Sequence, residues 1–161
     1  MKKLIILILV VTGINGLIYA GEGTENEKSH PNHLAVFIGA TTNPEAEQTN
    51  FTLGIDYEYK VGEKTGIGVL GEAIFAEHKE IIIGIPLFYH LQKVKLFVAP
   101  GILSTTEEDD HETEKVVKGL VRIGTSFDID VSGVSIAPTL SADFIDGNIS
   151  LIYGIGIGKG F

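Results

Sequence analysis

The sequence predicts an all-β protein, an eight-stranded antiparallel barrel of up-and-down topology behind a short N-terminal leader. Three observations predict it. β-branched and aromatic residues occur along the whole chain, apolar residues alternate with small or polar ones, and short connections alternate with long ones. No segment shows the period of an amphipathic helix. A chain of 161 residues has room for one domain with a complete core.

The N-terminus has the layout of a secretory signal peptide. Lys2 and Lys3 precede an apolar run that ends at Ala20, before a polar segment. We therefore predict a signal peptide at 1–20, a polar leader at 21–32 and a barrel domain at 33–161. Ile18 stands where a small residue is preferred, so the alternative is an uncleaved membrane anchor, although the apolar run is short for a spanning helix. The chain has no cysteine to carry a lipid or to form a disulfide.

The charge balance excludes one class of partner. Without the two lysines of residues 1–20, the 12 basic residues fall to 10 against 21 acidic ones, a formal charge of −11. An acidic surface of this kind repels nucleic acid. We expect no nucleic-acid partner.

Eight segments of strand length follow the leader, separated by polar or glycine-containing connections. They are 33–42, 51–61, 65–75, 80–91, 95–104, 116–128, 132–144 and 149–161. Pro86, Pro100 and Pro138 lie inside these segments, and each lacks a hydrogen-bond donor for the sheet. We expect bulges or different strand boundaries at the three prolines.

The connections alternate in length. Those at 61–65, 91–95 and 128–132 are tight, whereas 42–50 and 105–115 are long and polar, and 76–80 and 145–148 are intermediate. In an up-and-down barrel the alternate connections lie at opposite ends. The tight connections and both chain ends should therefore share one end.

Each segment has an apolar face and a small or polar face. In 51–61, for example, Phe51, Leu53 and Ile55 alternate with Thr52 and Gly54. A soluble lipocalin-like barrel, whose apolar face surrounds a small apolar ligand, shows the same alternation. We place the polar face inside, because it is dominated by Gly, Ser, Ala and Thr and its few charges have both signs, as a buried ionic network requires. Those charges are Asp56, Glu58, Lys60, Glu72, Lys118, Arg122, Asp128 and Asp143.

The aromatic residues of the apolar face form two groups at opposite strand ends. Phe51, Phe75 and Phe144 lie at the long-loop end, and Tyr59, Tyr89, Phe127 and Phe161 lie at the short-turn end. Two aromatic girdles are typical of a barrel at the two lipid–water interfaces. About ten residues at roughly 3.3 Å, tilted by about 40°, rise roughly 25 Å, the height of such an apolar band.

The last segment, LIYGIGIGKGF, places Tyr153, Ile155, Ile157 and Phe161 on the apolar face and glycines on the other, where they allow a narrow interior to close. It resembles the C-terminal assembly signal of bacterial outer-membrane barrels, which ends in Phe after apolar residues at alternate positions. Lys159 departs from that pattern, but its amine can extend toward water. The domain 33–161 resembles the small eight-stranded outer-membrane barrels of the OmpA/OmpX type. The resemblance implies location in the outer membrane, contact with its lipid and lipopolysaccharide, recognition of the C-terminus by the barrel-assembly machinery, and a monomer.

An eight-stranded barrel is filled by its side chains. We expect Lys118 near Asp143, and Arg122 facing Asp56, Glu58 and Glu72, as a structural salt-bridge plug, with a proton- or ion-conducting path as the alternative. His90 is expected at a strand end, facing inward.

The acidic loop holds carboxylates that hard divalent cations prefer, but its spacing matches no EF-hand, and we expect a solvated surface loop with no metal. The carboxylates are Glu107, Glu108, Asp109, Asp110, Glu112 and Glu114.

Some barrels of this kind modify lipid A, and the deacylases among them resemble a serine hydrolase with His and Ser two residues apart. No His-x-Ser occurs here. We predict no catalytic residues, no cofactor and a non-enzymatic barrel that presents polar loops in adhesion, defence or envelope maintenance. The alternatives are a secreted or periplasmic soluble barrel that binds a small apolar ligand and, less favoured, a lipid A-modifying enzyme.

Overall fold

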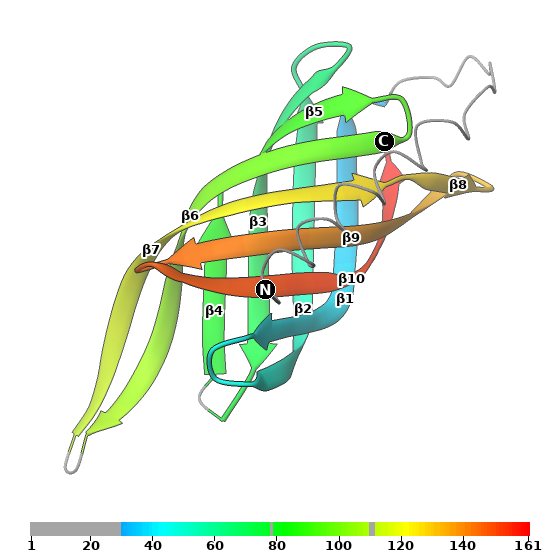
Figure 1. Cartoon of the computed structure of the whole chain (residues 1–161). Helices are drawn as coiled ribbons and strands as arrows, with labels where there is room; N and C mark the ends of the chain where they lie inside the picture. Colours follow the sequence, from blue (N-terminus) through cyan, green and yellow to red (C-terminus); the bar gives the residue numbers. More distant parts are fainter. Residues whose placement is uncertain (1–29, 78, 110–111) are drawn as a thin grey trace, which may run out of the picture.

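The computed structural model describes residues 30–77, 79–109 and 112–161, which form one antiparallel sheet (Figure 1). Its strands, in chain order, are β1 (Asn32–Asn43), β2 (Gln48–Lys60), β3 (Thr65–Phe75), β4 (Lys79–Gly84), β5 (Leu87–Leu91), β6 (Val94–Asp109), β7 (Glu112–Phe127), β8 (Ile129–Val131), β9 (Val134–Ile145) and β10 (Asn148–Gly160). No helix in these ranges is long and apolar enough to cross a membrane.

The ten segments build eight barrel strands. β4 and β5 pair with β3 and β6 in a single register, and they are separated only at Ile85 and Pro86. β7 and β8 likewise share one register against β9 and are separated at Asp128. Pairing of β1 with β10 closes the barrel, which is the predicted all-β, eight-stranded antiparallel architecture.

The closing seam reaches the last residue of the chain. The amide of Phe161 donates to the Asn32 carbonyl at 2.9 Å, and the Asn32 amide donates back at 3.3 Å. The side-chain amide of Asn32 also donates to the Phe161 carbonyl at 3.2 Å. The start of β1 and the terminal phenylalanine are thus bonded to each other.

One of the three prolines interrupts a strand. Pro86 is fully buried, and its carbonyl accepts a hydrogen bond from the Gly68 amide at 2.9 Å. Pro100 and Pro138 lie within β6 and β9, and the register does not shift at either of them, so neither forms a bulge. Pairing with one neighbouring strand is nevertheless interrupted there: the break between β4 and β5 lies opposite Pro100, and the break between β7 and β8 lies opposite Pro138. The expected disturbance of the sheet is therefore found at all three prolines as a strand boundary, at Pro86 itself and in the strands opposite Pro100 and Pro138, and not as a bulge.

The turn between the sixth and seventh barrel strands lies further along the chain than expected. Ser132 and Gly133 form it, with φ angles of 56° and 83°. Two consecutive residues with positive φ suit a two-residue hairpin turn, whose twist matches that of the strands. The predicted connection at 128–132 is wrong by about two residues, and this shift changes which side chains face each other across β7 and β9.

The apolar face points outward. Side chains such as Ile55 and Val69 are 58% and 54% exposed, whereas Thr52 and Glu58 on the opposite face are 0% and 2% exposed. A lipocalin-like barrel needs the reverse orientation. The structure therefore contradicts the soluble barrel with an inward apolar ligand site.

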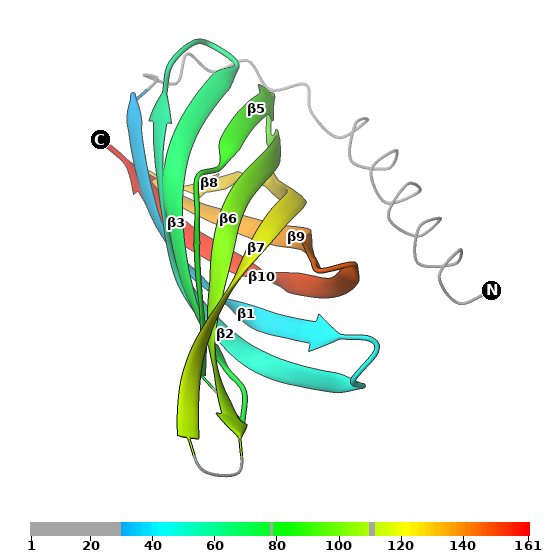
Figure 2. The same ribbon diagram turned by 90° about the vertical axis from the view of Figure 1, so that its left-hand side faces the viewer.

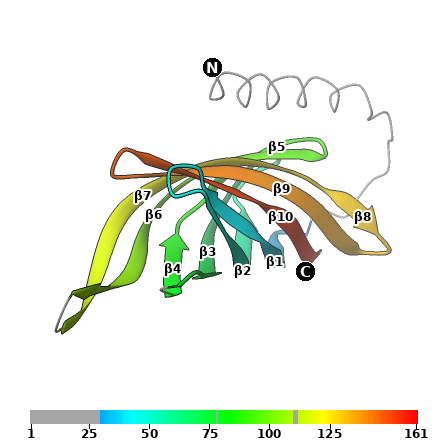
Figure 3. The ribbon, with the colours of Figure 1, turned by 60° about the horizontal axis from the view of Figure 1, so that its bottom comes forward.

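The longest ribbon leaves the barrel at the end opposite the start of β1 and the end of β10 (Figure 1). β6 pairs with β4 as far as Ser104, and β7 pairs with β9 from Leu120. In the described chain, residues 105–109 and 112–119 have only each other as neighbours in the sheet. Figures 2 and 3 show this hairpin, the β6–β7 ribbon, reaching beyond the other connections.

Candidate functional site

The barrel interior near the long connections contains an apolar cluster. A buried cluster there consists of Leu70, Ile74, Ile82, Ala99, Leu103 and Leu120, with Ile145 packed against it. The prediction that small residues dominate the inward face does not hold for this cluster, which has large aliphatic side chains.

A buried cluster of three charged side chains lies next to the apolar cluster. Arg122 of β7 binds Asp143 of β9 with two nitrogens, Nε to Oδ1 at 2.6 Å and Nη2 to Oδ2 at 2.9 Å. Its Nη1 donates to Oε1 of Glu72 on β3 at 2.6 Å. The three residues are 3%, 1% and 6% exposed. This cluster, named here the Arg122 triad, connects three strands through the interior.

A second ionic cluster lies nearer the short-turn end. Glu58 of β2 is within 2.5 Å of Nε2 of His90 on β5, and its other oxygen is 3.3 Å from Nζ of Lys95 on β6. The Lys95 amine also lies 5.0 Å from the centre of the Phe88 ring. This Glu58 cluster again joins side chains from three strands.

The predicted network is thus divided, and its partners differ in part from the prediction. Arg122 faces Glu72 as expected, but Glu58 binds His90 and Lys95 instead. The expectation that Lys118 lies near Asp143 is wrong, because the register sets Arg122 opposite Asp143. Lys118 is opposite Leu103 of β6.

The remaining predicted charges lie toward the short-turn end. Asp128 accepts a hydrogen bond from Oγ of Ser135 at 3.3 Å. Asp56 lines the interior cavity, and among the described residues neither Asp56 nor Lys60 forms an ion pair within 4 Å.

Sequence reasoning missed two members of the Glu58 cluster. The sequence predicts that His90 faces inward but does not predict its partner, and it does not predict that Lys95 belongs to the ionic network. Both have the parity of inward residues, since each is two positions from a phenylalanine that faces the interior, Phe88 or Phe97. The sequence alone could therefore have placed both side chains inside the barrel. Their contact with Glu58 depends on how the strands are arranged in the closed barrel.

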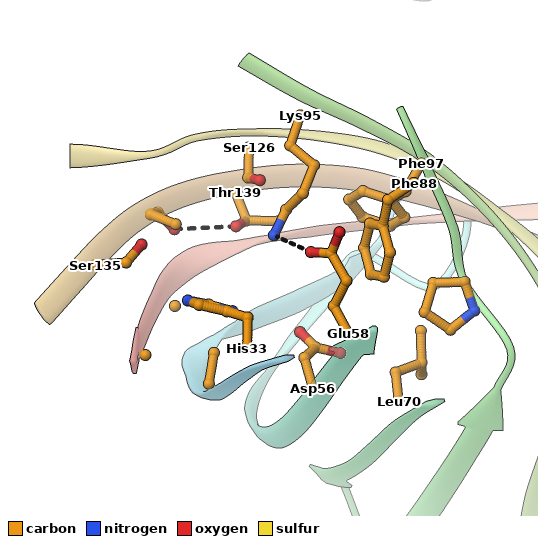
Figure 4. Close-up of a pocket in the computed structure, with 15 residues that line it drawn as sticks. His33, Asp56, Glu58, Leu70, Phe88, Lys95, Phe97, Ser126, Ser135 and Thr139 are labelled. Carbon is orange, nitrogen blue, oxygen red and sulfur yellow. Dashed lines mark hydrogen bonds and ion pairs between the residues drawn. The ribbon is translucent and has the colours of Figure 1, made fainter. Parts of the chain in front are cut away.

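A cavity of about 50 Å³ lies between the Arg122 triad and the short-turn end (Figure 4). Figure 4 shows side chains of β1, β2, β6, β7 and β9 around it, including His33, Asp56 and Lys95. Ser126 also lines it, is 5% exposed, and its hydroxyl has no hydrogen-bond partner among the described residues. The lining is mostly apolar, with side chains such as Leu70 and Phe97 beside a few polar ones, and the volume is that of roughly three water molecules.

Two terminal glycines are required by close packing. A Cβ on Gly154 would lie 2.7 Å from the Phe37 ring and would also meet the backbone of β1, and one on Gly158 would lie 2.6 Å from the His33 ring. A Cβ on Gly156 would have its nearest neighbour at 3.6 Å. The predicted role of glycine in closing the interior is confirmed for Gly154 and Gly158, but Gly156 has space for a methyl group.

The predicted aromatic girdle residues lie on the outer face at the strand ends. Phe51 and Phe75 are about half exposed, with ring centres 5.7 Å apart, and Phe144, Tyr59, Tyr89 and Phe161 are similarly exposed. Phe127 is half-buried. On β10, Tyr153, Ile155 and Ile157 also point outward.

The prediction of a loop at the acidic segment is wrong for most of its residues, because 105–109 belong to β6 and 112–115 to β7. The register sets Glu107 opposite Glu114 and Asp109 opposite Glu112. Asp110 of the weak metal candidate lies outside the described residues. In the rest of the chain as described, no three His, Asp or Glu side chains are grouped so that they could hold a metal ion.

Comparison with known proteins identifies the fold of the chain but does not assign it to a family. No family model and no curated protein sequence matches the chain. Among solved structures, the N-terminal β-barrel domain of Pseudomonas aeruginosa OprF superposes with a TM-score of 0.63 at 11% sequence identity, covering 83% of this chain and all of that one.

Two further structures are similar. Neisserial surface protein A has a TM-score of 0.55 at 11% identity, over 81% of this chain and 96% of that one. Ail, the attachment invasion locus protein of Yersinia pestis, has a TM-score of 0.53 at 12% identity, over 83% of this chain and all of that one. The chain has the fold of the small eight-stranded outer-membrane β-barrels.

Proposed function

We propose that this chain is an integral outer-membrane β-barrel without enzymatic activity, whose filled barrel is a scaffold for surface connections. The outward apolar face supports a lipid environment, since a large contiguous apolar surface is unfavourable in water. The strand ends carry aromatic residues on that same face, where lipid–water interfaces favour them. Outer-membrane lipid and lipopolysaccharide would then surround the barrel.

The interior supports a scaffold and not a solute pore. The apolar cluster and the Arg122 triad fill adjacent levels of the barrel. A barrel of eight strands is just wide enough for its side chains to fill. In a protein with a rigid scaffold of this kind, binding residues are usually found in the loops that connect the strands.

The observation that carries the proposal is the β6–β7 ribbon, which extends beyond the last pairings with β4 and β9. Its sequence is acidic, with like charges opposite each other at two register positions. Such an element suits a cationic partner at the cell surface. A sulfated polyanion, such as the heparin analogue bound by Ail, is disfavoured here by charge.

The membrane location is tested by expressing the full chain in a Gram-negative host and separating outer membranes. We expect a band in that fraction whose mobility on a denaturing gel changes on boiling. A soluble periplasmic band without such a change would refute the proposal.

The ribbon's role is tested with a variant in which Glu107, Glu108, Asp109, Asp110, Glu112 and Glu114 become Gln or Asn. Cells displaying the original barrel should retain a cationic probe such as polylysine more strongly than cells displaying the variant. The control changes Glu45 and Glu47, in the connection between β1 and β2, to Gln. Equal retention by all three would refute recognition through the ribbon.

We also propose that the barrel-assembly machinery recognises the C-terminal strand. Tyr153, Ile155 and Ile157 point outward on one face of β10, and Phe161, which directly follows the strand, is also exposed. Deletion of Phe161 should reduce the heat-modifiable form in outer membranes while the same chain still refolds in detergent. Unchanged assembly in cells would contradict this role.

A further inference from the structure

A groove lies on the outer face of the barrel near the short-turn end, where β1, β9 and β10 meet, and its volume is about 280 Å³. Four exposed apolar side chains and one exposed lysine form its walls. They are Leu34, Val36, Val134, Ile157 and Lys159. Ala35 and Gly158 pair directly and belong to the inward face, so their backbone forms the floor of the groove. The groove therefore has apolar walls and a single charge.

The groove lies where two neighbouring strands separate. β9 pairs with β10 as far as Gly158, whereas β10 continues to Gly160 beside β1. Figures 1 and 3 show the end of β10 turning away from the β8–β9 hairpin. Lys159 therefore has a neighbouring strand on one side only, at Leu34 of β1. Its side chain is exposed on the apolar face, where it departs from the apolar residues at alternate positions before it.

A backbone donor lies beside this lysine. The amide and carbonyl of Phe161 bond to Asn32 of β1. Residues of an antiparallel strand alternate in the side toward which their backbone groups point, so the amide of Gly160 points away from β1. It points to the side that β9 has left, and no backbone acceptor for it occurs in the part of the chain that the structure describes. The Lys159 amine and the Gly160 amide are thus two donors at one end of an apolar groove.

Such an arrangement matches an anionic phospholipid. The tight turns of an outer-membrane barrel lie on its periplasmic side, so Lys159 would lie at the periplasmic lipid–water interface. There its aliphatic stem can lie along apolar surface while its amine reaches the headgroups. A phosphate accepts charge-assisted hydrogen bonds from an ammonium and an amide. A single cation at the end of an apolar groove is therefore complementary to a single negative charge at the end of an acyl chain.

We propose that this groove binds one anionic phospholipid of the periplasmic leaflet, such as phosphatidylglycerol. One acyl chain lies along Leu34, Val36 and Ile157, and the phosphate is bound by the Lys159 amine and the Gly160 amide. The inference rests on the membrane location proposed above and names the lipid class at one place on the barrel.

The test is native mass spectrometry of the full mature barrel in detergent, mixed with equal amounts of phosphatidylglycerol and phosphatidylcholine that carry the same acyl chains. Because the chains are identical, a difference in occupancy measures the contribution of the headgroup. One lysine near an anionic lipid surface gives a preference of about fivefold. We expect one bound phosphatidylglycerol, favoured over phosphatidylcholine by about that factor.

Two substitutions of Lys159 assign the preference to the groove. Lys159→Gln should abolish it, whereas Lys159→Arg should keep it, and both variants should keep the mobility change on boiling. Lys64→Gln is the matched control, because Lys64 is exposed in the connection between β2 and β3 at the same end of the barrel, and it should keep the original preference. Inorganic phosphate, added in place of chloride at one ionic strength, should not displace the lipid, since it has no acyl chain for the groove.

Four results would overturn the proposal: equal occupancy by the two lipids, a preference that persists in Lys159→Gln, its loss in Lys64→Gln, or displacement of the lipid by inorganic phosphate. None of them bears on the membrane location or on what the β6–β7 ribbon binds. Failure of the proposed location is detected separately, as absence of the chain from the outer-membrane fraction.

Discussion

Replacing Arg122 with alanine removes the cation that Glu72 and Asp143 share. Both carboxylates are nearly fully buried, at 6% and 1% exposure, and would lose three charge-assisted hydrogen bonds of 2.6–2.9 Å. Breaking a buried ion pair in this way costs about 3–5 kcal/mol. We expect the equilibrium constant for unfolding to rise roughly a hundredfold to a few thousandfold, since about 1.4 kcal/mol is a factor of ten.

The assay is equilibrium unfolding by urea in phospholipid vesicles, with the folded fraction measured from unboiled gel samples. Lys159→Ala, which removes an exposed cation at the end of β10, is the matched control and should change the midpoint little. Asp143→Asn should be destabilising alone but much less so when added to Arg122→Ala, because the two residues interact directly. An Arg122→Ala midpoint equal to that of the control would refute the structural role of the triad.

Three further changes test the outer face, the interior and a turn by the same unfolding assay. Ile55→Lys places a charge midway along the outward face of β2 and should cost about 2–4 kcal/mol, whereas Val61→Lys at the short-turn end should cost about 1 kcal/mol or less. Equal effects would contradict a lipid-facing band. Gly154→Ala should lower the free energy of unfolding by about 1–3 kcal/mol through overpacking, and Gly156→Ala should lower it much less. A larger loss for Gly156→Ala than for Gly154→Ala would contradict the described interior packing. Gly133→Ala should cost about 1–2 kcal/mol because its φ is 83°, and no loss would contradict the turn at Ser132 and Gly133.

The sequence by itself determined the fold class, the number of barrel strands and the separation of an apolar from a polar face. These follow from alternation, because neighbouring residues of a strand point to opposite faces whatever their tertiary partners are. The small and oppositely charged residues of the polar face also predicted that this face is inside, as burial of Thr52 and Glu58 confirms. Each of these properties depends on residues close together in the chain.

Only the tertiary structure decided which interior side chains meet. The position of the β8–β9 turn sets the register, and a shift of about two residues sets Arg122, and not Lys118, opposite Asp143. The meeting of Glu58 with His90 and Lys95, and the apolar cluster around Leu70, likewise join separate strands. Alternation repeats every two residues and is the same in many registers, so it cannot select one of them. Turn geometry and the closure of the barrel make that selection, and with it they set the charges and the cavity of the interior.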